Sequence, residues 1–273
     1  MRSAVRAGAA VLATLALVGG GGLLLEAQAP NPPSAKPRPA AKAPAAEKLP
    51  AASEILARYT RVVGGEPAIR KYRSRRAVGR FELRAQGISG PIEILAAAPD
   101  RTLIRITLEG LGELLRGYDG AIGWSVDPAV GPRVLSGREL EEAQYAADFY
   151  SDIYTPADYA SMTVVGRGPF EGRDCFTVKL VRPSGFESHE YFDAQSGLRI
   201  GARMTSTSMM GSVPDVVTVF GQYRDFGGIM TPVTATQRAM GVESLLTLER
   251  IEYDTVRDDE LKPPPAIAVL AGK

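Results

Sequence analysis

The sequence is poor in the residues that carry most enzyme and metal chemistry, because it contains one cysteine and one histidine. Cys175 alone cannot form an intramolecular disulfide, so the fold must rest on its core. With one histidine and one cysteine, a metal site would have to be built from carboxylates. The run Asp258-Asp259-Glu260 lacks the alternating ligands of a calcium loop and reads as a solvated charge cluster. We therefore expect no metal and no cofactor.

Neither positive nor negative charge is in excess, and this balance argues against nucleic-acid binding. The chain has 32 Lys and Arg residues against 31 Asp and Glu residues, a net charge of +1. A nucleic-acid-binding protein normally shows a clear basic excess. We expect no nucleic acid among the partners.

His189 and Cys175 are the two residues on which an enzyme hypothesis would have to rest. His189 lies between Ser188 and Glu190 in a predicted strand, and alternation places those two side chains on the opposite face. A hydrolase using His189 therefore remains only a third hypothesis. Cys175 has no neighbouring histidine to activate it and is interpreted as a half-buried structural thiol.

The first 52 residues do not look like part of a globular body. Residues 1–29 have Arg2 and Arg6, an apolar run over 7–25 and Ala27-Gln28-Ala29, which is typical of an export signal, either cleaved or kept as an N-terminal anchor. No cysteine lies near the expected cleavage site of the export signal, so a lipidated N-terminus is not expected. Residues 30–52 are rich in proline and alanine and predict a semi-rigid tether.

The remaining chain alternates with period 2 over most of its length, which predicts strands. Ser53 is a candidate N-cap for a first helix over 53–63, and residues 137–149 predict a helical insert. Gly227-Gly228 is expected to be a turn. We expect one domain over 53–262 and a tail over 263–273. The expected strands are 76–86, 91–97, 101–108, 113–118, 121–126, 162–167, 174–181, 187–193, 198–206, 215–224, 230–238 and 244–254.

Most of these strands have one apolar face and one polar face. In 101–108, for example, Ile104 and Ile106 alternate with Arg105 and Thr107. The pattern predicts a mainly β (α+β) fold: a strongly curved antiparallel sheet forming an incomplete β-barrel, with the N-terminal helix and the helical insert covering the concave face. So large an apolar face is either filled by its own side chains or left partly open for an apolar ligand.

Several individual residues have two interpretations. Trp124 shares a strand face with Ile122 and Val126, and is either a core residue or part of a cavity wall. Met204, Met209 and Met210 form a soft apolar patch at a strand end. Arg199 and Arg203 lie on either side of Ile200 and are expected to be solvated.

The basic run over 70–76 is the strongest local charge feature. Its cations either complete a helix C-terminus or contact anionic lipid headgroups or an acidic partner. The residues expected to make such a membrane or partner contact are Arg70, Lys71, Arg73, Arg75 and Arg76.

Several segments resemble, in order, the periplasmic lipoprotein-carrier superfamily (LolA/LolB-like, including outer-membrane lipoprotein-sorting proteins). They are the helix 53–63, the strand 78–83 and the stretches 117–124, 191–198 and 223–232. The resemblance covers roughly residues 53–260. It implies an incomplete antiparallel barrel whose helices act as a lid over acyl chains. The chain departs from the receptor branch by lacking a lipidated cysteine, and from the soluble carriers by its long tether.

We therefore expect a non-enzymatic periplasmic carrier or sensor of a lipid or lipoprotein acyl chain, with an inner- or outer-membrane protein as a further partner. A monomer is expected. The alternative from another class is a membrane-tethered structural or interaction domain whose core is filled by its own side chains. The residues expected to line an acyl cavity are Phe81, Leu83, Ile94, Ile104, Ile106, Trp124, Phe176, Val178, Phe192 and Met204.

Overall fold

The computed structural model describes residues 49–208 and 210–272. The expected export signal, most of the expected tether and Met209 lie outside the described residues. No helix within the described ranges is long and apolar enough to cross a membrane.

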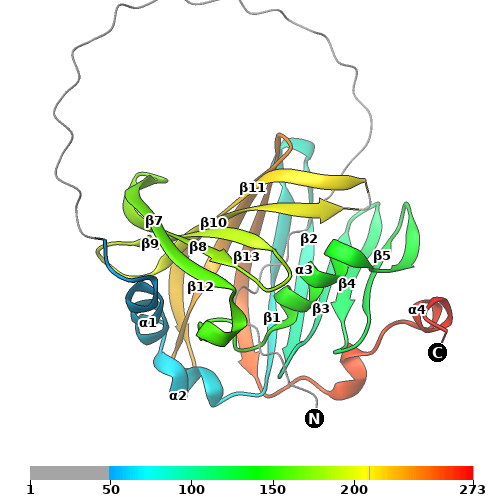
Figure 1. Ribbon diagram of the computed structural model, residues 1–273. Helices are drawn as coiled ribbons and strands as arrows, with labels where there is room; N and C mark the ends of the chain where they lie inside the picture. Colours follow the sequence, from blue (N-terminus) through cyan, green and yellow to red (C-terminus); the bar gives the residue numbers. More distant parts are fainter. Residues whose placement is uncertain (1–48, 209, 273) are drawn as a thin grey trace, which may run out of the picture.

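Thirteen antiparallel strands form a single sheet, in the order β6-β5-β4-β3-β2-β1-β13-β12-β11-β10-β9-β8-β7 (Figure 1). Almost every neighbour in this order is also a neighbour in sequence, as in a meander. The exception is the pair β1 and β13, in which Arg75 faces Tyr253 and Phe81 faces Leu246. The strands are β1 (Ser74–Leu83), β2 (Ile88–Ala97), β3 (Arg101–Leu108), β4 (Gly112–Tyr118), β5 (Gly123–Asp127), β6 (Gly131–Val134), β7 (Ser161–Phe170), β8 (Arg173–Val181), β9 (Glu187–Asp193), β10 (Arg199–Ser208), β11 (Gly211–Phe226), β12 (Ile229–Ala239) and β13 (Val242–Tyr253).

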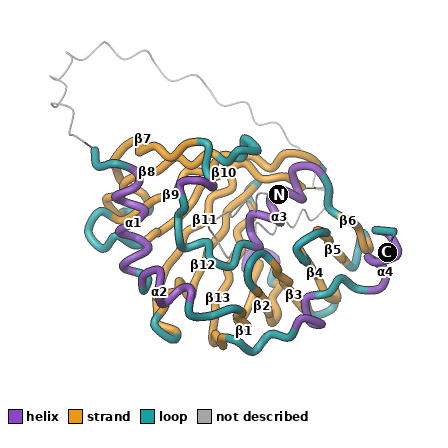
Figure 2. Tube along the Cα trace, turned by 60° about the horizontal axis from the view of Figure 1, so that its bottom comes forward, coloured by secondary structure: helices purple, strands orange, loops and turns teal. Residues whose placement is uncertain are grey.

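The sheet curves strongly but does not close, because its end strands β6 and β7 do not pair with each other. The helix α3 (Gly137–Ala147) connects these two strands and contacts β3, β4 and β5 on one side and β10 on the other. It therefore lies within the curve of the sheet (Figures 1 and 2). We call the face turned toward α3 the concave face and the opposite one the convex face.

Helices α1 (Ala52–Val62) and α4 (Pro265–Leu270) lie near the two ends of the sheet (Figure 2). Helix α1 packs beside β7, and α2 (Gly65–Arg70) follows it; α4 packs beside β6. There are also three short 3-10 helices within the described residues: η1 (Arg84–Gln86), η2 (Pro156–Asp158) and η3 (Asp258–Leu261). Two helices, α1 and α3, thus cover the concave face, as expected.

The described core is divided between the two faces of the sheet. On the concave face, β1–β3 and β10–β13 contribute one large cluster that includes Phe81, Ile94, Ile106 and Phe220. A second cluster lies between α1 and β8 and β9. A third lies on the convex face, where Leu261 and Ile267 of the C-terminal segment are buried against β2, β3 and β5.

All twelve expected strands are present, several with shifted ends. The sequence pattern missed β6, a four-residue edge strand that contains Pro132 and pairs only with β5. Helix α1 begins at Ala52 rather than after Ser53, and the Glu54 carboxylate accepts a hydrogen bond from the N–H of Ala51 at 3.1 Å. The described part of the expected tail, residues 263–272, contains the helix α4, in which Ile267 is fully buried.

The Gly227-Gly228 turn is confirmed and joins β11 to β12. Both residues have positive φ angles, 62° and 90°, which favour glycine. The Tyr72 hydroxyl donates a hydrogen bond to the carbonyl of Gly227 at 2.8 Å, so this turn is tied to the chain between α2 and β1.

Candidate functional site

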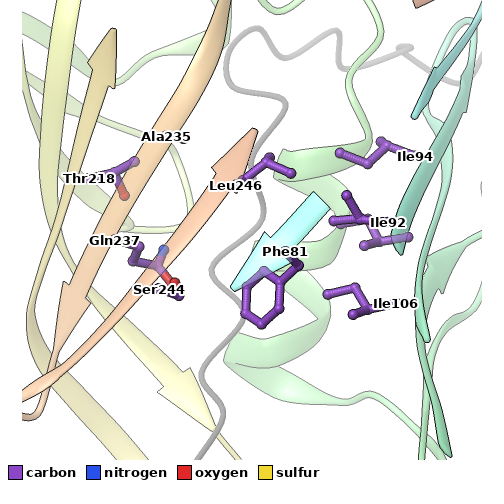
Figure 3. Close-up of a pocket in the computed structure, with 10 residues that line it drawn as sticks. Phe81, Ile92, Ile94, Ile106, Thr218, Ala235, Gln237, Ser244 and Leu246 are labelled. Atoms are coloured by element: carbon purple, nitrogen blue, oxygen red, sulfur yellow. The ribbon is translucent and has the colours of Figure 1, made fainter. Parts of the chain in front are cut away.

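The concave face contains a small hollow between two groups of strands (Figure 3). The ring of Phe81 lies between isoleucines of β2 and β3 on one side and the polar side chains of Gln237 and Ser244 on the other. The cavity measures about 40 Å³, which is room for a few water molecules. Its lining residues are Phe81, Ile92, Ile94, Ile104, Ile106, Thr218, Ala235, Gln237, Ser244 and Leu246.

Four of the residues expected in an acyl cavity line this hollow: Phe81, Ile94, Ile104 and Ile106. Leu83 and Met204 belong to the same concave cluster but lie outside the hollow. Alternation along β2 places Ile92 on the same face as Ile94 and could have identified it. The wall from β11–β13 depends on pairing between distant strands, which the sequence alone does not specify.

Three more of the expected residues lie beneath α1 instead of at the hollow. Val178 and Phe192 are fully buried, and Phe176 packs against them. The ring of Tyr59, on α1, meets the ring of Phe192 edge to face with centroids 5.5 Å apart. The helix itself thus fills this part of the concave face.

The assignment of Trp124 to a concave cavity was wrong. Trp124 is fully buried on the convex face, against Leu95, Leu103, Leu261 and Ile267. Apolar residues occupy both faces of the neighbouring strands β2–β4, so an apolar strand face did not reveal which side of the sheet it belonged to.

A buried polar network lies between α1 and the concave face of β9 and β10. Arg199 is not solvated: its side chain is 5% exposed and lies 3.4 Å from the Glu190 carboxylate, which is 2% exposed. The hydroxyl of Tyr154 donates to Glu190, and Arg199 donates to Tyr154 at 3.1 Å. Tyr59 donates to Asp152 at 2.6 Å. Burial opposes the charge of Arg199, but Tyr154, Tyr59 and Glu190 outweigh it and raise its pKa.

The same network anchors α1 to the sheet. Arg58 of α1 donates to the carbonyl of Ala194, in the turn between β9 and β10, at 2.9 Å. Thr60 donates to the carbonyl of Asp152 at 2.8 Å. These contacts, with the apolar cluster beneath, make α1 a closely held cover and not a loose one.

The expected membrane or partner contacts divide into three groups. Arg70, Lys71 and Arg73 are exposed, although Arg70 pairs with Glu66. Arg76 faces the convex side and is held by Glu93 and by Glu260, the latter at 2.6 Å. Arg75 faces the concave side and is only 9% exposed, so it cannot contact a membrane surface in this conformation.

No known family model matches the chain, and no curated protein matches it. Solved structures do. A LolA superfamily protein from Nitrosomonas europaea has 14% identity and a TM-score of 0.51, over 79% of this chain and 99% of that one. A DUF1329 family protein from Desulfovibrio piger has 13% identity and a TM-score of 0.52, over 77% of this chain and 97% of that one. The chain has the fold of the LolA superfamily.

Within this LolA-like fold, His189 faces outward and its would-be partners face inward. Ser188 and Glu190 are buried at 1% and 2% exposure, while the Nε2 of His189 lies 3.9 Å from Glu187 on the outer face. The local triad geometry is therefore not formed, as alternation predicted.

Cys175 is fully buried in the LolA-like fold, and burial raises the pKa of its thiol to about 11. A thiol in such an environment is protonated at neutral pH and unreactive. No group of three or more His, Cys, Asp or Glu residues in residues 49–208 and 210–272 is arranged to hold a metal ion. The acidic run is instead engaged in ion pairs, with Asp258 to Arg101 and Glu260 to Arg76.

Proposed function

We propose that the chain is a non-enzymatic carrier or sensor that binds the acyl chain of a lipid or lipoprotein on the concave face of its sheet. The observation that carries this proposal is the hollow around Phe81, walled by isoleucines and leucine and bordered by Thr218, Gln237 and Ser244. Burying an apolar chain there would contribute about 0.8 kcal/mol per methylene. The polar border would leave one end of the ligand in contact with water.

The size of the hollow requires the concave face to open when a long ligand enters. Helix α3 is the proposed moving part, because polar contacts attach it to β6 and β10 and its apolar contact is a small cluster, in which Leu140, Ala143 and Ala147 pack against Tyr118 and Leu135. The Glu142 carboxylate accepts from Ser206 of β10 at 2.6 Å, and Arg133 of β6 pairs with Glu139 at 2.6 Å. Water can take over the polar contacts once α3 moves, so only this small apolar cluster would lose its burial.

The export-type N-terminal sequence supports a periplasmic location for this activity, with the protein either free or held by its N-terminus. The exposed cations Arg70, Lys71 and Arg73 are the proposed contacts with an anionic membrane surface or an acidic partner. Arg76 is omitted because it is already paired, and Arg75 because it is buried.

The small hollow favours a second candidate function, an interaction domain whose concave face is filled by its own side chains. Val178 and Phe192 under α1 have no exposed surface, as in a permanent core. In this case the outer surface, and not the interior, would meet the partner.

The two candidate functions predict different results for acyl binding: a carrier, once freed of lipid, should bind a fatty acid, and a self-filled interaction domain should not. Ala235 lines the hollow, so Ala235→Leu fills it with three additional carbon atoms. We expect a fluorescent fatty acid to bind the native protein at micromolar concentration and to bind Ala235→Leu about tenfold more weakly, a change of about 1.4 kcal/mol. Thr236→Leu, on the opposite face of the same strand, is the matched control and should bind like the native protein.

Absence of binding by the native protein would reject the carrier and favour the interaction domain. Native mass spectrometry of protein purified from the periplasm gives an independent measurement. It would show the mature N-terminus and the mass of any lipid that remains bound.

A further inference from the structure

Arg75 is a buried cation with no hydrogen-bond or ion-pair partner among the described residues. Its side chain lies inside the fold at 9% exposure, and its Nε and Nη2 atoms are buried with no hydrogen-bond acceptor. Burial lowers the pKa of Arg75, and Tyr253 and Asp152, which act in the opposite direction without pairing with it, offset this only in part, yet a guanidinium remains charged at neutral pH. The protein thus keeps a positive charge in its interior without a paired anion.

The environment of Arg75 contrasts with that of Arg199, the buried arginine under α1. Arg199 has Glu190 and Tyr154 within reach and Asp152 at 3.8 Å. Arg75 instead lies beneath the ring of Phe149, whose centroid is 5.8 Å from the guanidinium carbon. A desolvated charge of this kind is costly unless an opposite charge joins it.

The position of Arg75 relates it to the apolar hollow. It is on the same face of β1 as Ala77 and Phe81, both of which belong to the concave cluster. Phe81 is six positions after Arg75 along the strand, which corresponds to about 20 Å. A long amphiphile lying along β1 could thus place its polar end at Arg75 and its tail at the hollow.

We propose that Arg75 binds the anionic group of an acidic amphiphile, a carboxylate or a phosphate, whose apolar tail lies along β1 toward Phe81. This inference rests on the proposed acyl-binding function and specifies the ligand's head. The guanidinium is suited to the task because its planar donors match carboxylate and phosphate oxygens in pairs. The ring of Phe149, in the connection between α3 and β7, covers Arg75 in the ligand-free protein and moves aside when the anion enters.

The test compares three ligands with the same tail and different heads: hexadecanol, palmitic acid and hexadecyl phosphate. Each displaces a fluorescent fatty alcohol from the native protein, from Arg75→Gln and from Arg80→Gln. Arg80 is an exposed arginine on the opposite face of the same strand, with 53% side-chain exposure, and serves as the matched control.

We expect the native protein and Arg80→Gln to bind at least one of the two acidic ligands tenfold or more tightly than hexadecanol. Arg75→Gln should bind all three equally while keeping the native affinity for hexadecanol. The acidic ligand that binds more tightly shows where the anionic group of the natural ligand comes from. Tighter binding of palmitic acid indicates a free fatty acid, and tighter binding of hexadecyl phosphate indicates a phospholipid. Equal binding of all three by the native protein, or a retained preference in Arg75→Gln, would overturn the Arg75 site alone. Absence of binding by every ligand would overturn the acyl-binding function and this site with it.

A further variant separates ligand binding from folding. Arg75→Met keeps an unbranched side chain and removes the charge, so its urea midpoint should equal or exceed that of the native protein without ligand. A clearly lower midpoint would mean that Arg75 already has its stabilising partner within the fold, and would overturn the proposal.

Discussion

Two arginines four positions apart on β10 show how strongly the environment of a single residue depends on the fold. Arg199 is buried against Glu190, whereas Arg203 is 53% exposed and pairs at the surface with Asp215 at 2.8 Å. A surface pair is worth little because water solvates both charges. Loss of one member of a buried pair leaves the other charge without compensation.

This contrast predicts different effects for the same substitution. Arg199→Leu should lower the free energy of unfolding by about 3–5 kcal/mol, because Glu190 would remain buried without its cation. Arg203→Leu should change it by less than about 1 kcal/mol. Urea denaturation of both variants, followed by circular dichroism, measures the difference. Equal losses would show that Glu190 finds another partner or water once Arg199 is removed.

At the scale of secondary-structure elements, the C-terminal segment covers part of the convex face of the sheet, which its composition did not predict. Leu261 of η3 and Ile267 of α4 are buried on the convex face, where they cover Trp124. Since Trp124 is the single tryptophan of the chain, its fluorescence reports directly on this contact.

We expect Ile267→Asp to detach α4 from the sheet, because a carboxylate cannot be buried among apolar side chains without a partner. Trp124 emission should shift to longer wavelength and become accessible to acrylamide. Leu270→Asp, in the same helix but 57% exposed, is the control and should leave the emission unchanged. An unchanged spectrum in Ile267→Asp would mean that Trp124 is covered without α4.

At the scale of the whole molecule, buried carboxyl groups link stability to pH. Burial raises the pKa of Asp148, in the connection after α3, to about 7, although Tyr150 donates its N–H to this carboxylate at 2.9 Å and Arg182 lies nearby. The folded protein therefore holds a proton that the unfolded chain releases near pH 4. Stability from this group is complete below about pH 4 and is lost as the pH rises through about 7.

The free energy of unfolding should therefore fall between pH 4.5 and 7.5, by up to about 4 kcal/mol from Asp148 alone. Burial raises the pKa of Glu142 and of Asp100 as well, which adds to the trend. Asp148→Asn should flatten the profile measured by urea denaturation at several pH values. Asp215→Asn, an exposed site, should retain the native slope. A native profile that rises with pH would contradict the assignment.

Much of the fold could be predicted because period-2 alternation is a local signal. The boundaries of β3 and β9 were correct to the residue, and the Gly227-Gly228 turn was correctly expected and joins β11 to β12. β6 was missed because a four-residue strand containing Pro132 has no alternation to detect. Whether a segment forms a strand depends mostly on residues that are adjacent in sequence, so the sequence alone can predict it.

The candidate site could be predicted only in part, for a different reason. Phe81, Ile94, Ile104 and Ile106 were identified because they lie on adjacent early strands with one clear apolar face. Their counterparts Ala235 and Leu246 come from strands more than 100 residues later in the chain and meet them only through the pairing of β1 with β13. Trp124 was placed on the wrong side because the neighbouring strands β2–β4 bury apolar side chains on both faces.

By itself, the sequence determined that the protein is an open, curved antiparallel sheet with few helices, in which His189 and its would-be partners lie on opposite strand faces. These properties follow from alternation and composition, which act over a few residues. The tertiary structure alone decided which apolar face is concave, how far α1 and α3 fill it, and that Arg75 and Arg199 lie inside. Burial of a charged or aromatic side chain depends on what distant strands and helices bring against it, and no local pattern encodes that.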